Sequence, residues 1–149
     1  MKMKLVCAFA LMFMGFQSMG QDFGDHKSST LTSKAWGALG AGNPDLAITY
    51  VNKCVELYLA EAKKMQGELS EAAPKDTASE YWALNDVGTS LFIKGEAYMK
   101  KGDTKKALEA YKQLVNELKF AQCWDEKGWF WKPADAAKQK IVELSFDAE

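Results

Sequence analysis

The chain contains no arginine, and His26 is its only histidine. Its basic side chains are all lysine, which lacks the planar guanidinium fork that holds a phosphate or a guanine through two parallel hydrogen bonds. The net charge of −1 gives no general attraction to nucleic acid or to an anionic membrane.

A single histidine near the N-terminus also leaves no Ser/His/Asp or Cys/His pairing for a folded core, and neither a zinc-ligand spacing nor a phosphate-binding glycine loop is present. We therefore predict a protein that is not an enzyme, carries no cofactor or metal and binds no nucleic acid.

Long apolar runs are absent except at the start of the chain. There, Lys2 and Lys4 precede an apolar run over 5–16, and Ser18-Met19-Gly20 follows it. The run is shorter than the roughly 20 residues that a membrane-spanning helix needs. The pattern is typical of a secretory signal peptide over residues 1–20, cleaved before Gln21, with an uncleaved anchor as the alternative. We expect an exported, soluble protein in the periplasm or at the cell surface, whose net charge falls to −3 when Lys2 and Lys4 are removed.

Cysteine is scarce, and Cys54 and Cys123 are the two that follow the predicted cleavage site. In an oxidising compartment they could form one disulfide. Alternatively, Cys54 is a small buried hydrophobe on the apolar face of a helix, and Cys123 is a free thiol beside Trp124. The sequence leaves both alternatives open.

Sustained alternation of apolar and polar residues, which marks β-strands, is missing as well. Polar residues dominate 21–31, which we interpret as a flexible leader before a helical domain over 32–149. Within that domain apolar residues recur every three or four positions. They predict about five helices, over 32–39, 44–69, 77–101, 103–120 and from 133 onward. Short turns between them predict an all-α fold of antiparallel helical hairpins closed by a C-terminal capping helix.

Local signals support several of these helix boundaries. Asn43 and Pro44 are suited to the N-cap and first position of the second helix, and Asp103 to the N-cap of the fourth. The segment Thr77–Glu80 has the sequence of a capping box. In this motif the threonine side chain accepts a hydrogen bond from the glutamate backbone amide, and the glutamate carboxylate accepts one from the threonine backbone amide. We predict that the third helix begins with this box.

Gly88 and Gly95 lie on the apolar face of the third predicted helix, with Leu84 and Leu91. Each glycine costs about 1 kcal/mol of helix stability relative to alanine. Their position therefore predicts that another helix approaches this face closely.

One spacing occurs twice in the chain, as Gly102-x4-Ala107-x3-Tyr111-x2-Leu114 and, sixty residues earlier, as Gly42-x4-Ala47-x3-Val51-x2-Cys54. Together with Leu91, Gly95 and Tyr98, the later copy resembles the tetratricopeptide repeat family over Leu91–Lys119. The resemblance implies stacked helical hairpins that hold other proteins. The sixty-residue separation exceeds the roughly 34 residues of that family. We therefore predict two long helices, over 44–69 and 77–101, packed against each other.

In that family the first helix of each hairpin lines a concave surface that receives an extended peptide or a helix of a partner. Carried over to this chain, the resemblance implies a partner-binding surface made by Lys34, Thr89, Phe92, Glu96, Met99 and Lys100. Phe92 and Met99 lie beside the apolar stripe of the third helix, so burial in the protein's own core is the alternative for both.

Four aromatic residues gather near the C-terminus, at Trp124, Trp129, Phe130 and Trp131. They could cap the end of the last hairpin, or form an aromatic platform for a sugar ring or an apolar peptide side chain. We expect an exported helical-repeat scaffold or adaptor with a protein or peptide partner. The alternatives are a carbohydrate-binding accessory protein that uses Trp124, Trp129 and Trp131, and a structural subunit that binds copies of itself.

Overall fold

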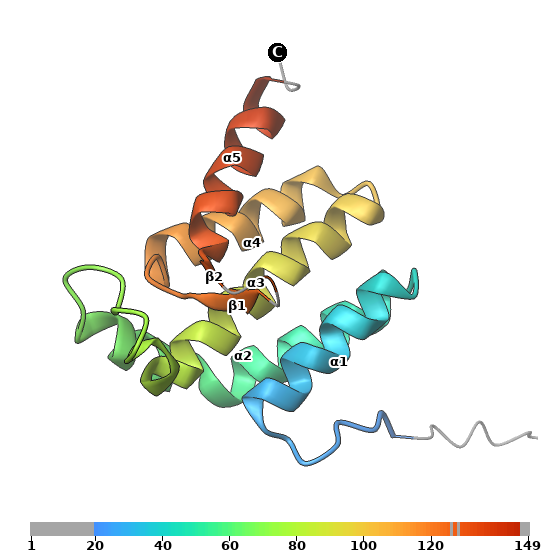
Figure 1. Ribbon diagram of the computed structural model, residues 1–149. Coiled ribbons are helices and arrows are strands. Elements are labelled where there is room, and N and C mark those ends of the chain that lie inside the picture. Colours follow the sequence, from blue (N-terminus) through green and yellow to red (C-terminus); the bar gives the residue numbers. More distant parts are fainter. Residues whose placement is uncertain (1–19, 126, 128, 147–149) are drawn as a thin grey trace, which may run out of the picture.

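The structure is a computed structural model that describes residues 20–125, 127 and 129–146. The described residues form five α-helices, a 3₁₀ helix and a β-hairpin (Figure 1). The elements are α1 (Ser28–Gly40), α2 (Pro44–Gly67), η1 (Ala78–Tyr81), α3 (Trp82–Lys100), α4 (Thr104–Glu117), β1 (Cys123–Asp125), β2 (Trp129–Trp131) and α5 (Pro133–Phe146). The all-α architecture predicted from the sequence is confirmed, with α5 as its last helix. No helix in the described part is long and apolar enough to cross a bilayer.

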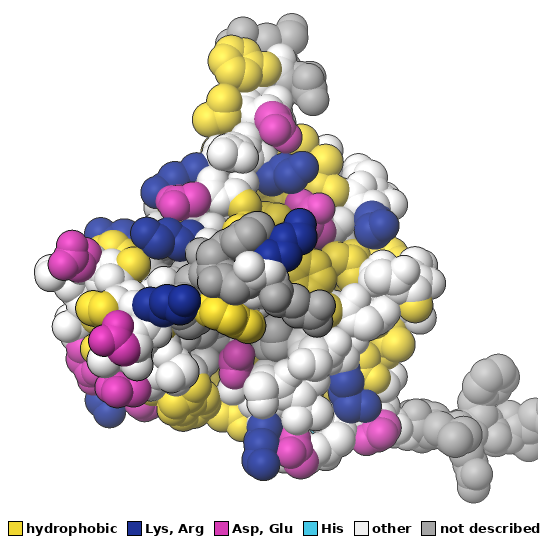
Figure 2. Space-filling view, in the orientation of Figure 1, with side chains coloured by type: hydrophobic (Ala, Val, Ile, Leu, Met, Phe, Trp, Pro, Cys, Tyr) yellow, Lys and Arg dark blue, Asp and Glu magenta, His cyan; other side chains and the backbone are white. Residues whose placement is uncertain are grey.

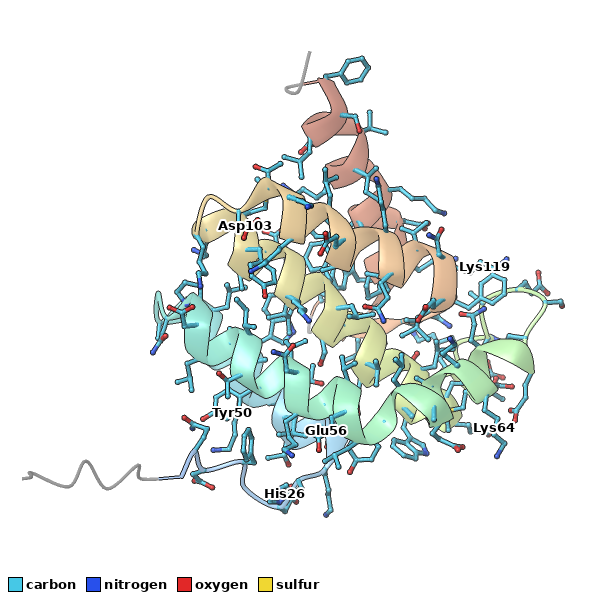
Figure 3. The ribbon with its side chains drawn as sticks, turned by 180° about the vertical axis from the view of Figure 1, so that it is seen from behind. His26, Tyr50, Glu56, Lys64, Asp103 and Lys119 are labelled. Atoms are coloured by element: carbon cyan, nitrogen blue, oxygen red, sulfur yellow. The ribbon has the colours of Figure 1, made fainter. Side chains whose placement is uncertain are left out.

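The helices form two stacked helical hairpins, α1 with α2 and α3 with α4. The face seen in Figure 1 carries α1, the β-hairpin and α5, while α2 and α4 lie in front when the molecule is seen from behind (Figure 3). The long helices α2 and α3 make the most extensive contact between elements. The predicted packing of two long helices is therefore confirmed, and both helical hairpins share one core around Val51, Leu84 and Leu91.

The turns inside the two helical hairpins are copies of each other. Gly42 and Gly102 adopt the left-handed backbone conformation, with φ of 76° and 74°, which glycine enters without steric penalty. Asn43 N donates to Ala38 O, and Asp103 N donates to Tyr98 O, both at 2.9 Å. The repeated spacing in the sequence thus corresponds to a repeated turn.

The N-caps after these turns are confirmed. The Asn43 side-chain oxygen accepts a hydrogen bond from Leu46 N at 3.1 Å, and Asp103 Oδ1 accepts one from Lys106 N at the same distance. Each cap satisfies a backbone amide that the first turn of a helix leaves without an intrahelical partner.

The capping box predicted at Thr77–Glu80 is wrong. The Thr77 side chain caps no helix, and its hydroxyl donates to Pro74 O at 3.4 Å. The chain instead continues through the 3₁₀ helix η1, and α3 begins at Trp82. The threonine follows a turn closed by its own backbone amide bonding to Pro74 O at 3.1 Å, which leaves it without the geometry of an N-cap.

The predicted start of the first helix at Thr32 is four residues late. Leu31 N donates to Lys27 O at 3.0 Å, and both Ser28 and Leu31 are buried, so α1 begins inside the segment predicted as a leader. The residues before α1 lie along α2. Phe23 stands edge-on to Tyr50 with ring centroids 6.1 Å apart, and the carbonyl of His26 accepts a hydrogen bond from the Tyr58 hydroxyl at 2.7 Å.

The two glycines of α3 admit close neighbours. A Cβ on Gly95 would overlap the ring of Tyr111 in α4, and a Cβ on Gly88 would overlap the side chain of Ala121. The predicted close approach of a helix is confirmed at Gly95. At Gly88 the neighbour is the segment after α4, which crosses α3 and leads into the β-hairpin. That hairpin was not predicted from the sequence.

Candidate functional site

A groove opens between α1, the start of α3 and β1. It consists of two adjoining hollows of about 420 and 350 Å³ that share Trp36, Cys123 and Trp124. Figure 2 shows this side of the molecule, with the partly grey β-hairpin at the centre and hydrophobic side chains emerging around it. We call it the tryptophan groove, and its described lining residues are Ser29, Thr32, Ser33, Trp36, Ser79, Trp82, Asn85, Asp86, Thr89, Gln122, Cys123, Trp124, Asp125 and Trp131.

Three indole rings in this groove are unusually exposed. Trp36, Trp82 and Trp124 are 39%, 44% and 51% exposed. Trp82 stands edge-on to Tyr58 with ring centroids 5.7 Å apart, and the Lys75 ammonium lies 5.4 Å from the centroid of the Trp124 ring. Exposed apolar side chains that gather around one hollow mark an interaction site, and tryptophan is prominent among residues that dominate binding energies.

The floor of the groove is polar and joins α1 to α3. Ser28 Oγ donates to Asp86 Oδ2 at 2.5 Å, and the Thr32 hydroxyl lies 2.9 Å from the Ser90 hydroxyl and 3.2 Å from Asp86 O. Burial raises the pKa of the Asp86 carboxyl, and the hydrogen bond from Ser28 offsets this only in part. Among the described residues, none forms an ion pair with Asp86 within 4 Å, and Ser28 provides the one hydrogen bond to its carboxylate.

Two amides beside Asp86 hold the β-hairpin in place. Asn85 donates to Ala78 O at 2.7 Å and accepts from Gln122 N at 2.9 Å. The Gln122 side chain in turn donates to Ala73 O at 2.8 Å. Asn85 and Gln122 therefore use their polar groups to fasten β1 and the 68–77 loop to α3.

The described aromatic side chains of the β-hairpin differ in what they contact. In the antiparallel register Cys123 pairs with Trp131 and Trp124 with Phe130. Trp131 packs edge-on against Phe92, as the capping alternative requires. Trp124 lines the groove and is half exposed, as the platform alternative requires. The side chains of Trp129 and Phe130 lie outside the described part of the structure.

Three of the residues expected to bind a partner are engaged in the fold. Phe92 is 8% exposed, between Tyr111 and Trp131. Its burial in the core, the alternative considered from the sequence, is the one observed. Glu96 accepts a hydrogen bond from the Tyr111 hydroxyl at 2.5 Å, and Met99 packs against the core.

The other three expected residues are spread over the molecule. Thr89 is buried at the edge of the tryptophan groove. Lys34 faces the segment before α1, where it pairs with Asp22 at 3.7 Å and lies 5.6 Å from the Tyr50 ring. Lys100 is exposed at the end of α3. The structure therefore does not bring the six residues into one surface, and Thr89 alone among them lines the groove.

Both described cysteines are free thiols. Cys54 is buried in α2 with its Sγ 3.9 Å from the Thr32 hydroxyl, and Cys123 lines the groove. Burial raises the pKa of each thiol, which keeps it protonated and poorly reactive at neutral pH. The described residues include no group of three or more His, Cys, Asp or Glu side chains that could hold a metal ion.

Trp36, Trp82 and Asp86 are among the groove residues that were not predicted from the sequence. One signal for Trp36 was present, because it lies on the same face of α1 as Ser29, Thr32 and Ser33, opposite Leu31 and Ala35. A large indole among small hydroxyl side chains on a helix face is a mark of an open surface.

Residues 89–117 match the family model for the tetratricopeptide repeat. The match begins inside α3, crosses the turn at Gly102 and ends with α4, and it overlaps the segment of the sequence resemblance over 91–117. No curated protein and no solved structure is significantly similar to this chain. Residues 89–117 of the second helical hairpin are thus similar to a tetratricopeptide repeat, and they belong to an all-α fold of stacked helical hairpins.

Proposed function

We propose that this protein is an exported helical-repeat adaptor that binds a protein or peptide partner in the tryptophan groove. A tetratricopeptide repeat suggests a scaffold for protein interaction. The observation that carries the proposal is the convergence of Trp36, Trp82 and Trp124, from three separate elements, on one groove.

The groove is suited to binding because its walls are already ordered. Trp82 is held against Tyr58, and Trp124 lies in a strand whose neighbour packs on the core. Rigid indoles lose little conformational entropy when a ligand covers them, so more of the contact energy is retained as affinity. The two hollows have the volume of a few side chains, which favours an extended segment of a partner over a broad flat interface.

Site-specific photocrosslinking in cells tests this proposal. A photoreactive amino acid at Ser33, an exposed residue of the groove, is compared with one at Thr49, an exposed residue of α2 outside the groove. We expect a discrete adduct with another protein from position 33 and none from position 49. The adduct should be lost when Trp36 and Trp82 are both replaced by alanine, and an equal yield from both positions would rule out groove binding.

Export is the second part of the proposal, and it rests on the signal-peptide pattern of residues 1–20. All of these except residue 20 lie outside the described residues. Cell fractionation and N-terminal sequencing of the native protein test it. We expect Gln21 as the first residue, in the periplasmic or surface fraction. An intact Met1 in the cytoplasm would contradict export.

Carbohydrate binding is the second candidate function, supported by the half-exposed Trp124 in a groove that Ser29 and Ser33 also line. Indole rings stack on sugar rings, and hydroxyl groups bond to sugar hydroxyls. A glycan array with the secreted chain and its Trp124→Ala variant tests this. Retention of a glycan by the wild-type chain alone favours this candidate over the adaptor. Sedimentation of the same chain distinguishes a self-assembling subunit from both.

A further inference from the structure

We propose that the tryptophan groove selects a basic side chain of the partner, a lysine ammonium or an arginine guanidinium, with Asp86 as its counter-ion and the indoles as its walls. The inference rests on the proposed function and names the chemistry of the bound segment. It follows from the charge of the groove, the surroundings of Asp86 and the type of its aromatic residues.

The groove is acidic although the chain as a whole is nearly neutral. Asp86 and Asp125 are among its described lining residues, and no lysine is among them, although the Lys75 ammonium lies against the Trp124 ring. The chain as a whole carries 19 basic and 20 acidic residues, so two carboxylates with one adjacent ammonium make this surface more acidic than the chain. Between low-dielectric walls a carboxylate acts over a longer range than in open water, so the groove attracts cations and repels acidic segments.

Asp86 lies at the base of the groove without a cation of its own. Within the described part its carboxylate accepts one hydrogen bond, from Ser28, and makes no ion pair. A partly buried carboxylate is stabilised by a cation that approaches it, because the desolvation has already occurred on folding. A ligand ammonium or guanidinium supplies this missing charge.

The walls also favour a cation. Tryptophan binds cations on its face more strongly than tyrosine or phenylalanine does. The chain already shows this contact, since the Lys75 ammonium lies 5.4 Å from the centroid of the Trp124 ring. The aliphatic stem of a bound lysine or arginine would lie along the indoles while its charged end reaches Asp86.

The base of the groove offers a neutral sugar few free hydrogen-bond donors. The amides of Asn85 and Gln122, which would be natural ligands for sugar hydroxyls, donate to the carbonyls of Ala78 and Ala73. The Asp86 carboxylate accepts hydrogen bonds and cannot donate them while ionised. The groove therefore offers more to a cation than to an uncharged polar ligand.

Titration of the exported chain with small probes, followed by the indole N–H signals in NMR spectra, tests the inference. The probes are Nα-acetyl-lysine N-methylamide, its uncharged analogue Nα-acetyl-norleucine N-methylamide, and N-acetylglucosamine. We expect the lysine probe to shift the signals of Trp36, Trp82 and Trp124, with an affinity about tenfold above that of the norleucine probe. The difference should shrink as salt is added. Equal affinities for lysine and norleucine, or a response to the sugar alone, would overturn the inference.

Two variants with the same change of charge locate the effect. Asp86→Asn should remove most of the preference for lysine over norleucine. Glu56→Gln, on the exposed face of α2 seen from behind in Figure 3, should leave it unchanged. Thermal unfolding of each variant confirms that it is folded. A preference that survives Asp86→Asn in a folded protein would exclude Asp86 as the counter-ion.

These results are separable from the proposed function. If position 33 crosslinks a partner and the lysine probe does not compete with it, the adaptor function stands and the basic-side-chain inference fails. If no partner crosslinks at position 33 while the lysine probe binds, the groove recognises cations and the adaptor function fails.

Discussion

The indole of Trp131 stands edge-on to the ring of Phe92, with centroids 4.9 Å apart and the ring planes at 84°. The ring of Phe92 also packs against that of Tyr111 in α4, with centroids 5.9 Å apart. These three rings fasten the β-hairpin to the second helical hairpin. Since the same β-hairpin carries Trp124, the packing of Trp131 decides where Trp124 stands in the groove.

Trp124 and Trp131, the β-hairpin tryptophans whose side chains are described, should therefore differ in their effect on stability. Trp131→Ala removes a packed aromatic ring and should lower the free energy of unfolding by about 1.5–3 kcal/mol. Trp124→Ala removes a half-exposed ring and should change it by about 0.5 kcal/mol or less. Urea denaturation measures both values. Equal losses for the two variants would show that Trp124 is as much a part of the cap as Trp131.

Gly95→Ala should destabilise the protein in spite of the better helix propensity of alanine. The added Cβ overlaps the buried ring of Tyr111, and overpacking of this kind costs about 1–3 kcal/mol. Gly37→Ala is the matched control, because Gly37 lies within α1 with open space around its Cβ position. It should stabilise by about 0.4–1 kcal/mol. Thermal and urea unfolding measure whether each variant is less or more stable than the wild-type protein. A Gly95→Ala variant that is more stable would contradict the close approach of α4.

Asp86→Asn should raise the melting temperature at neutral pH. Burial raises the pKa of Asp86 in the folded state above its ordinary value of 3.8, so the folded state binds more protons than the unfolded state between the two values. Stability therefore falls as pH rises through this window, and the loss is complete above the folded-state pKa. The advantage of the asparagine variant should shrink as the pH is lowered toward 3.8.

The groups that face Asp86 do not disturb this comparison. The thiols of Cys54 and Cys123 interact with its charge, and burial keeps both protonated through the acidic range. Melting curves of the wild-type protein and the variant from pH 4 to pH 7 measure the effect. A wild-type protein that is more stable than Asp86→Asn at neutral pH would show that the carboxylate stabilises the fold.

Tyr111 should resist ionisation while the protein is folded. Burial raises its pKa first, and the Glu96 carboxylate that accepts its hydrogen bond at 2.5 Å raises it further. In an alkaline absorbance titration, Tyr111→Phe should remove no tyrosine that titrates before unfolding. It should also cost about 1 kcal/mol of stability through loss of the hydrogen bond. Tyr81→Phe is the control, because the Tyr81 hydroxyl makes no hydrogen bond within the described part of the chain.

The sequence predicted those features that depend on local chemistry. Asn43 and Asp103 each follow a glycine turn, and the oxygen of such a short side chain reaches the backbone amide three residues later, which caps the helix. Gly95 predicted a close helix because its cost in propensity demands a compensating contact. The box at Thr77 failed because a turn at Pro74, a few residues earlier, already used the backbone that the box requires.

The groove could not be predicted in the same way, because its walls come from distant segments. Trp36 lies in α1, and Trp82 and Asp86 lie at the start of α3 with nothing in the local sequence to distinguish them. They come together only after α3 packs beside α1 and the segment that follows α4 crosses α3. Phe92, one residue of the surface expected from the resemblance, is buried for a related reason, since Trp131 packs against it.

The hydrogen bonds of Ser28, Thr32, Asp86 and Ser90 have a mechanical consequence. Trp36 belongs to the first helical hairpin, whereas Trp82 and Trp124 are fixed to the second. Apolar side chains alone would let α1 slide along α3, but directional bonds such as the 2.9 Å contact of Thr32 with Ser90 hold one register. These bonds therefore also fix the distance of Trp36 from the other two indoles. A ligand that contacts all three indoles would add contacts between the two helical hairpins.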